Sequence, residues 1–214
     1  MKTKIALALL WIAFTTYAFG FAPPANPADP GGMNEIIALI QGKGEPLILA
    51  LFNVMGLIPV LYLFLLIPDG HGQKLPAWPF GILMFAIGAF VLIPYLVFRK
   101  PHSEWPQPKK AGLAVRIFDL RWLALFFVAL TVGTLANGVF HGNWSIFVEQ
   151  WQQSRFINVM TFDFLLSSLL LGVLIPDDLK RRGVKDSSFQ WLGALPLVGP
   201  MVYLVLRPDL SREG

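Results

Sequence analysis

Residues 47–67 read LILALFNVMGLIPVLYLFLLI, an apolar run in which Asn53 and Tyr62 carry the only polar side chains. A run of about 20 apolar residues matches a hydrocarbon core about 30 Å thick, because a helix rises about 1.5 Å per residue. Lipid offers the backbone no hydrogen-bond partner, so such a run must be helical. The run therefore predicts a transmembrane helix.

Similar runs follow along the whole chain. Hydrophobic residues make up 55% of its 214 residues and charged residues only 14%, whereas soluble domains carry about 25% charged residues. The predicted fold class is an all-α integral membrane protein with six transmembrane helices in a single membrane domain, residues 1–214. The six predicted spans are residues 5–21, 47–67, 78–98, 120–140, 156–175 and 191–206.

Three short motifs occur twice, in the same order and at nearly the same spacing. They are Asn53-Val54-Met55 with Asn158-Val159-Met160, Ile67-Pro68-Asp69 with Ile175-Pro176-Asp177, and Tyr95-Leu96-Val97 plus Arg99 with Tyr203-Leu204-Val205 plus Arg207. These pairs predict two three-helix repeats, about 1–100 and about 118–208, joined by a basic linker at about 101–117. An odd number of helices per repeat predicts that the two repeats have inverted topology.

Charge supports the inverted arrangement, because the loop 69–77 carries only Lys74 while its counterpart, 177–188, carries four basic residues. An inverted repeat places a functional site near the midplane, between the halves. The alternative is that duplication built a stable bundle without a transport role.

The basic residues concentrate in the loops after the third and fifth predicted spans, which the positive-inside rule places in the cytoplasm. Both termini are therefore predicted to be non-cytoplasmic, in a bacterial inner membrane or a thylakoid-type membrane. Residues 1–20 also read as a signal peptide. We favour a retained first helix, although Lys2 and Lys4 argue for the opposite orientation.

Asp163, near the centre of the fifth predicted span, is the foremost candidate for a site. An ionisable group in hydrocarbon is costly, so it should face protein or water. Ser167 lies one turn further on the same helix face, and Asn158 and Asn53 are equivalent positions of the two repeats. These four residues are the predicted ligand-binding set. The alternative is that they form interhelical hydrogen bonds.

Several classes of site are not indicated. The chain has no cysteine, which excludes disulfides and thiolate chemistry. The three histidines have no metal-binding spacing, and catalytic carboxylate pairs and phosphate-binding glycine loops are missing. Enzymatic activity is therefore left open, and the basic loops predict contact with lipid, not with nucleic acid.

Leu51-Phe52-Asn53-Val54, Pro59, the loop at Pro68 and Pro94-Tyr95-Leu96 resemble the abscisic-acid-deficient-four-like proteins. These are small membrane proteins of plastids and cyanobacteria that are associated with neoxanthin formation in plants. The second half is similar to a short bacterial membrane family of unknown function. The residues that carry this second likeness are Asn158, Asp163, Ser167, the loop 178–183, Leu197-Val198-Gly199-Pro200 and Tyr203.

The resemblance implies a carotenoid or another isoprenoid as ligand, and a pattern of four spans, to which the first and fourth predicted spans would be additions. Our hypothesis is a bundle whose central groove binds such a lipophilic molecule through Asp163, Asn158, Asn53 and Ser167. Two alternatives are a small proton-coupled transporter and a non-catalytic subunit or assembly factor of a larger membrane complex. The expected partners are the bilayer and such membrane-complex subunits.

Overall fold

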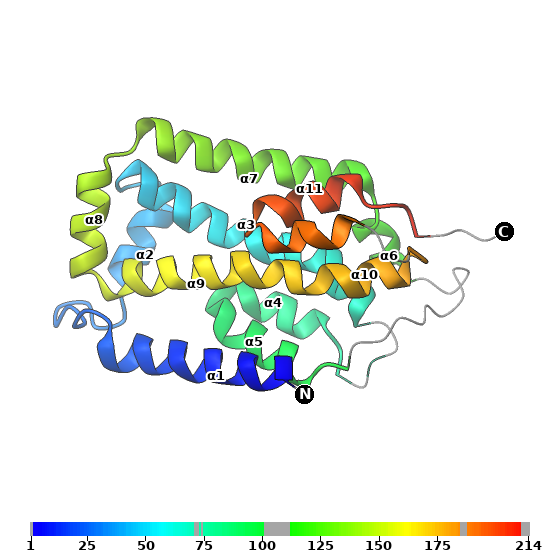
Figure 1. Cartoon of the computed structure of the whole chain (residues 1–214). Coiled ribbons are helices and arrows are strands. Elements are labelled where there is room, and N and C mark those ends of the chain that lie inside the picture. Colours follow the sequence, from blue (N-terminus) through cyan, green and yellow to red (C-terminus); the bar gives the residue numbers. More distant parts are fainter. Residues whose placement is uncertain (1, 71–72, 74, 101–111, 185–187, 211–214) are drawn as a thin grey trace.

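The computed structural model describes residues 2–70, 73, 75–100, 112–184 and 188–210. Within these residues the regular elements are all helical (Figure 1). The first half contains α1 (Lys2–Thr16), a π-helical turn η1 (Tyr17–Phe21), α2 (Met33–Ile40), α3 (Pro46–Asp69), α4 (Trp78–Ile87) and α5 (Ala89–Phe98). The second half contains α6 (Leu113–Phe118), α7 (Arg121–His141), α8 (Trp144–Gln153), α9 (Arg155–Leu171), η3 (Gly172–Leu174), α10 (Ile175–Arg181), η4 (Ser188–Ala194) and α11 (Val198–Leu206).

Four helical segments of the described chain are long and apolar enough to cross a membrane, not six. They are Lys2–Phe21, Pro46–Asp69, Arg121–His141 and Arg155–Arg181. The last comprises α9, η3 and α10 and bends at the 3-10 turn. The protein is thus a helical membrane protein, but the predictions of single spans at 78–98 and 191–206 are wrong.

The segment 78–98 is a hairpin of two short helices because Gly88 breaks it. Gly88 has a φ of 46°, a left-handed conformation that suits glycine. Each arm has 10 residues, or about 15 Å, which is half of a hydrocarbon core. Gly70, after α3, lies against Ala77, and Arg99, after α5, pairs with Asp69. Both arms therefore end beside the C-terminus of α3.

The segment 188–206 forms a second hairpin, from η4 and α11. Its turn contains Pro196 and Leu197, and Leu197 has a φ of 57°. The N–H of Leu197 donates to the carbonyl of Ser168, 3.1 Å away, in the last turn of α9. The hydroxyl of Tyr203 donates to Asp178 in α10. Like the first hairpin, this one has its turn inside the bundle, and its two arms begin and finish at the same end of the bundle.

The two central helices run in the same direction (Figure 1). Near their starts, Ile48 of α3 and Ile157 of α9 belong to one apolar cluster. Near their ends, Asp69 and Arg181 form an ion pair of 2.9 Å. The predicted inverted topology is therefore wrong. Each half has two helical segments long and apolar enough to cross a membrane and a hairpin of shorter helices, and an even number of such segments per half agrees with halves of the same orientation.

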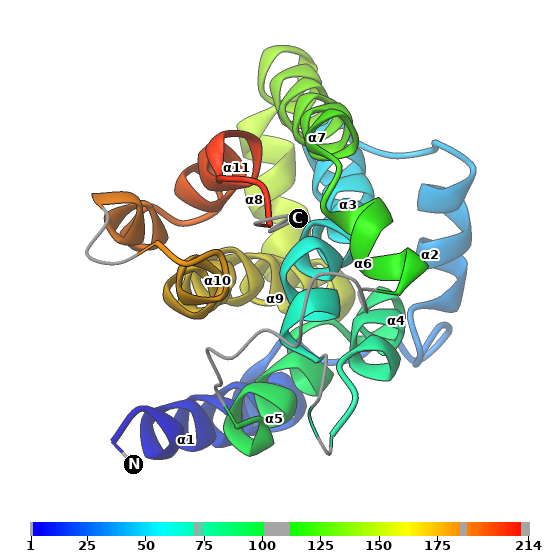
Figure 2. The ribbon, with the colours of Figure 1, turned by 90° about the vertical axis from the view of Figure 1, so that its right-hand side faces the viewer.

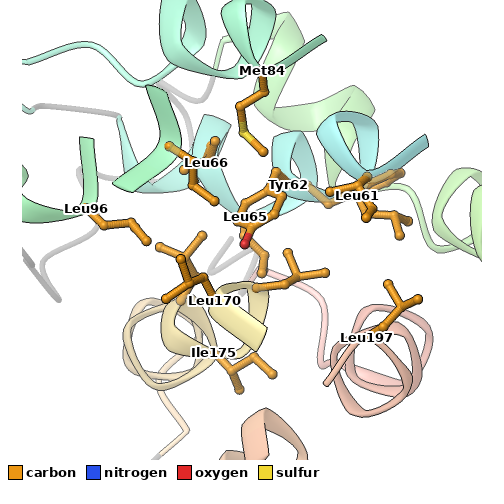
Figure 3. Close-up of a cluster of buried hydrophobic side chains, with 14 of the residues drawn as sticks. Leu61, Tyr62, Leu65, Leu66, Met84, Leu96, Leu170, Ile175 and Leu197 are labelled. Carbon is orange, nitrogen blue, oxygen red and sulfur yellow. The ribbon is translucent and has the colours of Figure 1, made fainter. Parts of the chain in front are cut away.

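The main apolar core lies between α3, the two hairpins and α9–α10 (Figure 3). Its buried side chains include Leu61, Tyr62, Leu65, Leu66, Met84, Leu96, Leu170, Ile175 and Leu197. Helices α1 and α7 lie on opposite sides of this centre, α1 against α5 and α7 against α3 (Figure 2). Their outer faces are exposed and apolar, as helices facing lipid must be.

Candidate functional site

A pocket with a volume of about 1170 Å³ lies between η1, α2, α3, the turn at Gly88 and α9. Eight phenylalanine and methionine side chains belong to its apolar lining: Phe19, Phe52, Met55, Met84, Phe85, Phe90, Phe156 and Met160. Ile40, Phe85 and Ile87 also line it and are exposed. Exposed apolar side chains therefore border the pocket.

Asp163 forms the floor of this pocket. Its Oδ1 accepts the backbone N–H of Ala89, at 2.8 Å, and the hydroxyl of Ser167, at 3.0 Å. Ala89 is the first residue of α5, so Asp163 of α9 caps the N-terminus of a helix in the other half. A carboxylate is stabilised there by the free N–H groups and by the positive end of the helix dipole.

Gly88 makes this contact possible in two ways. Only glycine adopts its backbone conformation readily, and a Cβ at this position would collide with the Asp163 carboxylate. The turn of the first hairpin therefore fits directly onto Asp163. Sequence analysis could identify Asp163 from its position in a span, but the partner of Asp163 follows only from the hairpin.

The four predicted site residues divide between the pocket and its support. Asp163 and Asn53 line the pocket, and Asn53 is exposed to it. Ser167 is fully buried behind Asp163. Asn158 is also buried: it accepts the hydroxyl of Tyr17, at 2.8 Å, and donates to the carbonyl of Trp151, at 3.1 Å. The structure therefore brings only two of the four to the pocket surface.

The mouth of the pocket is polar. Asp29 caps α2 by accepting the N–H groups of Met33 and Asn34, each at 2.9 Å. Glu35 accepts the hydroxyl of Ser154, at 2.7 Å, which ties α2 to the start of α9. The Arg155 Nε donates to the carbonyl of Pro23, at 2.8 Å. These contacts hold α2 over the pocket and leave polar groups at its rim.

Sequence analysis missed a buried network at the opposite end of the bundle, where α3, α5, α10 and α11 finish. We call this the arginine end. Asp69 accepts the hydroxyl of Tyr95, at 2.7 Å, and the guanidinium of Arg99, at 2.8 Å. Each of these three residues belongs to one of the repeated motifs, so the repeats in the sequence already pointed to these positions.

The second half has a similar network around Asp178. Its Oδ2 accepts the hydroxyl of Tyr203, at 2.6 Å, and Arg207 lies 3.5 Å away. The repeated motifs align Asp69 with Asp177, but Asp177 instead pairs with Arg99, at 2.7 Å. In both halves, an aspartate at the end of a crossing helix thus holds the returning arm of a hairpin.

Two consecutive arginines join these networks. Arg181 pairs with Asp69, at 2.9 Å, and lies 3.8 Å from Asp178. Arg182 pairs with Asp178 and Asp119, each at 2.8 Å. Burial acts to lower the pKa of the Arg182 guanidinium, but these two carboxylates outweigh it, and the pKa lies above its usual value. Arg182 therefore stays charged, and removing one of its partners would leave a buried charge.

No group of three or more His, Asp or Glu side chains within the described ranges could hold a metal ion. The predicted family resemblance remains a prediction. Comparison with protein-family models, with curated proteins and with solved structures found no match for this chain.

Proposed function

We propose that this protein binds a lipid-soluble small molecule in the pocket above Asp163, and that the molecule enters from the bilayer. One observation carries the proposal: a pocket of about 1170 Å³, walled by phenylalanine and methionine, ends on a single buried carboxylate. Ligand pockets are typically apolar with a few polar groups that orient the ligand. Methionine side chains also adapt to irregular apolar ligands.

The shape of the ligand follows from where the polar groups lie. Asp163 is at the floor, Asn53 is on the wall, and Arg155 is at the mouth. Arg155 lies eight residues before Asp163 on α9, which corresponds to about 12 Å. A molecule with an apolar body and a polar end group matches this order. An isoprenoid or carotenoid has such a body, and that identification rests on the family resemblance alone.

Filling the pocket tests the proposal. Gly56 lines the pocket, and a Cβ added there would have no atom within 4 Å. Gly56→Phe should therefore place its ring in the pocket without displacing the backbone. Gly133 on α7 has equally open space but faces outward, so Gly133→Phe is the matched control.

The measurement is mass spectrometry of a solvent extract of the protein, purified in mild detergent. We expect a stoichiometric lipophilic compound with the wild type and with Gly133→Phe, and its loss with Gly56→Phe. Equal amounts in both variants would contradict the proposal.

A proton-coupled transporter is the second candidate, because the N-terminus of the short helix α5 points into the middle of the bundle at Asp163. Transporters commonly place such half-helix ends at their binding sites. Against this, the buried side chains of Leu66, Leu170 and Leu174 fill the space toward the arginine end. Proton-driven uptake into vesicles that is lost in Asp163→Asn would favour transport.

The third alternative, a subunit or assembly factor of a larger membrane complex, has no support from a particular surface and remains a prediction. Stoichiometric co-purification of other membrane proteins, together with a ligand-free pocket, would favour it.

We also propose that the arginine end faces the cytoplasm, as predicted for the basic loops, but that both termini lie on this side too, which reverses the side predicted for them from six spans. Of the lysines and arginines that the structure describes, only Lys43 and Arg155 lie at the other end. Lys4 donates to the carbonyl of Arg99 and the N–H of Leu210 donates to Asp119, so both ends of the described chain lie at the arginine end. With four crossing helices, the positive-inside rule therefore puts both in the cytoplasm.

The chain has no cysteine, so single-cysteine variants can test this orientation. An impermeant maleimide added to intact cells should label Gln152→Cys on α8 and spare Lys100→Cys. The opposite pattern would overturn the orientation.

A further inference from the structure

We propose that the ligand binds Asp163 through a hydrogen-bond donor, a hydroxyl or an ammonium group, and that the pocket rejects ligands ending in a carboxylate. This inference rests on the proposed function and names the chemical class of the ligand's end group. Three features of the pocket support it. The two oxygens of Asp163 differ in their hydrogen bonds, no group of the described chain donates to Oδ2, and the N-terminus of α5 points at Asp163.

The two carboxylate oxygens of Asp163 have different surroundings. Oδ1 is held by Ala89 and Ser167, at 2.8 and 3.0 Å. Oδ2 accepts no hydrogen bond from any residue that the structure describes, although Asp163 is only 7% exposed. A carboxylate oxygen accepts up to two hydrogen bonds, and a buried acceptor without a partner is costly. Oδ2 is thus an acceptor available to a ligand in the pocket.

Within the described ranges, no residue donates a hydrogen bond to Oδ2, and the amide of Asn53, which also lines the pocket, donates to neither oxygen of Asp163. Val159 and Met160 on α9 and Gly88 and Phe90 at the hairpin turn add no side-chain donor to the lining. Arg155, the positively charged residue in the described lining, lies about 12 Å from Asp163 along α9. Its Nε already donates to the carbonyl of Pro23. Because the protein leaves the acceptor unmatched, the donor must come from the ligand.

An anionic ligand is disfavoured for a separate reason. The N-terminus of a helix is an anion site, but Asp163 already occupies the N-terminus of α5. A second carboxylate would meet the first across an apolar pocket, where charge repulsion is poorly screened. The same geometry therefore selects donors and excludes acids.

A series of probes with one alkyl chain separates these end groups: 1-dodecanol, dodecyl methyl ether, dodecylamine and dodecanoic acid. The ether keeps the oxygen of the alcohol and removes only its donor. Native mass spectrometry of the full-length protein, with pairs of probes in competition, measures the ratio of one-to-one adducts. A hydrogen bond to a charged group corresponds to about tenfold or more in affinity, so we expect this preference for alcohol over ether. The amine should bind and the acid should not.

Asp163→Asn should abolish the alcohol-to-ether preference. Asp29→Asn should preserve it, because Asp29 lies at the mouth and asparagine also caps helices. The ratio measured on the wild type needs no variant, so it tests the inference even if Asp163→Asn does not fold. Equal binding of alcohol and ether to the wild type would overturn the inference and leave the proposed function standing. Absence of binding of every probe, with an empty solvent extract, would instead overturn the proposed function.

Discussion

Two adjacent aspartates at the arginine end should differ strongly in what their removal costs. Asp178 is fully buried, and its Oδ2 accepts Arg182 at 2.8 Å and Tyr203 at 2.6 Å. The side chain of Asp177 is 15% exposed and pairs with Arg99. We therefore predict that Asp178→Ala destabilises the protein far more than Asp177→Ala.

The magnitudes follow from which charges each change leaves behind. Asp178→Ala leaves Arg182 and Arg207 buried, with only the partly exposed Asp119 as a shared carboxylate. Removing one partner of a buried ion pair typically costs about 3–5 kcal/mol. Asp177→Ala leaves Arg99 paired with Asp69, at 2.8 Å. The loss of the outer, partly exposed pair should cost about 1 kcal/mol or less.

Unfolding by sodium dodecyl sulfate in mixed micelles, followed by tryptophan fluorescence, measures both free energies of unfolding. Asp69→Ala is a useful third variant, because Asp69 accepts Tyr95, Arg99 and Arg181 and should be as sensitive as Asp178. A cost for Asp177→Ala equal to that for Asp178→Ala would refute the reasoning. So would a cost below about 1 kcal/mol for Asp178→Ala, since it would mean that the buried network contributes little.

Two further pairs of variants test the pocket. Gly88→Ala should destabilise the protein by at least about 1–2 kcal/mol, the cost of a left-handed conformation for a residue with a Cβ, because its Cβ also meets Asp163. Gly56→Ala, in open space on the pocket wall, should not destabilise it, and equal unfolding midpoints would contradict this. Asn158→Ala should cost about 1–3 kcal/mol by leaving buried partners unbonded, whereas Asn53→Ala should weaken ligand binding without loss of stability. If Asn158→Ala weakened ligand binding and Asn53→Ala lowered the stability instead, the pocket would not lie where we place it.

Local sequence patterns predicted much of the fold. Apolar runs at 47–67 and 156–175 predicted the two central helices, since no other structure satisfies the backbone in lipid. The runs at 78–98 and 191–206 have the same composition but form hairpins. Hydropathy cannot distinguish one helix that crosses from two half-helices that return, because both bury the same apolar residues. Gly88 and Pro196 mark the breaks, yet glycine and proline are also common in uninterrupted transmembrane helices.

The error in the number of spans produced the error in topology. Three crossings per half require inversion, whereas two crossings and a returning hairpin require the same orientation. The positive-inside rule was then applied to the wrong set of loops, which is why the predicted side of the termini is reversed in our proposal. Two conformational features separate the two interpretations: the turn at Gly88 against Asp163 and the turn at Leu197 against Ser168.

The sequence by itself determined the class of protein and that Asp163 faces protein, where it is 7% exposed, because both follow from the cost of polar groups in hydrocarbon. It also marked Asp69, Tyr95, Arg99 and their counterparts through the repeated motifs. Only the tertiary structure decided which groups these residues meet. Asp178, not Asp177, accepts Tyr203 because consecutive residues of a helix point in different directions, and only the packing of α11 decides which of them faces it. Asp163 caps α5 because a hairpin 74 residues away folds back onto it. Such contacts join segments distant in sequence, and no local pattern encodes them.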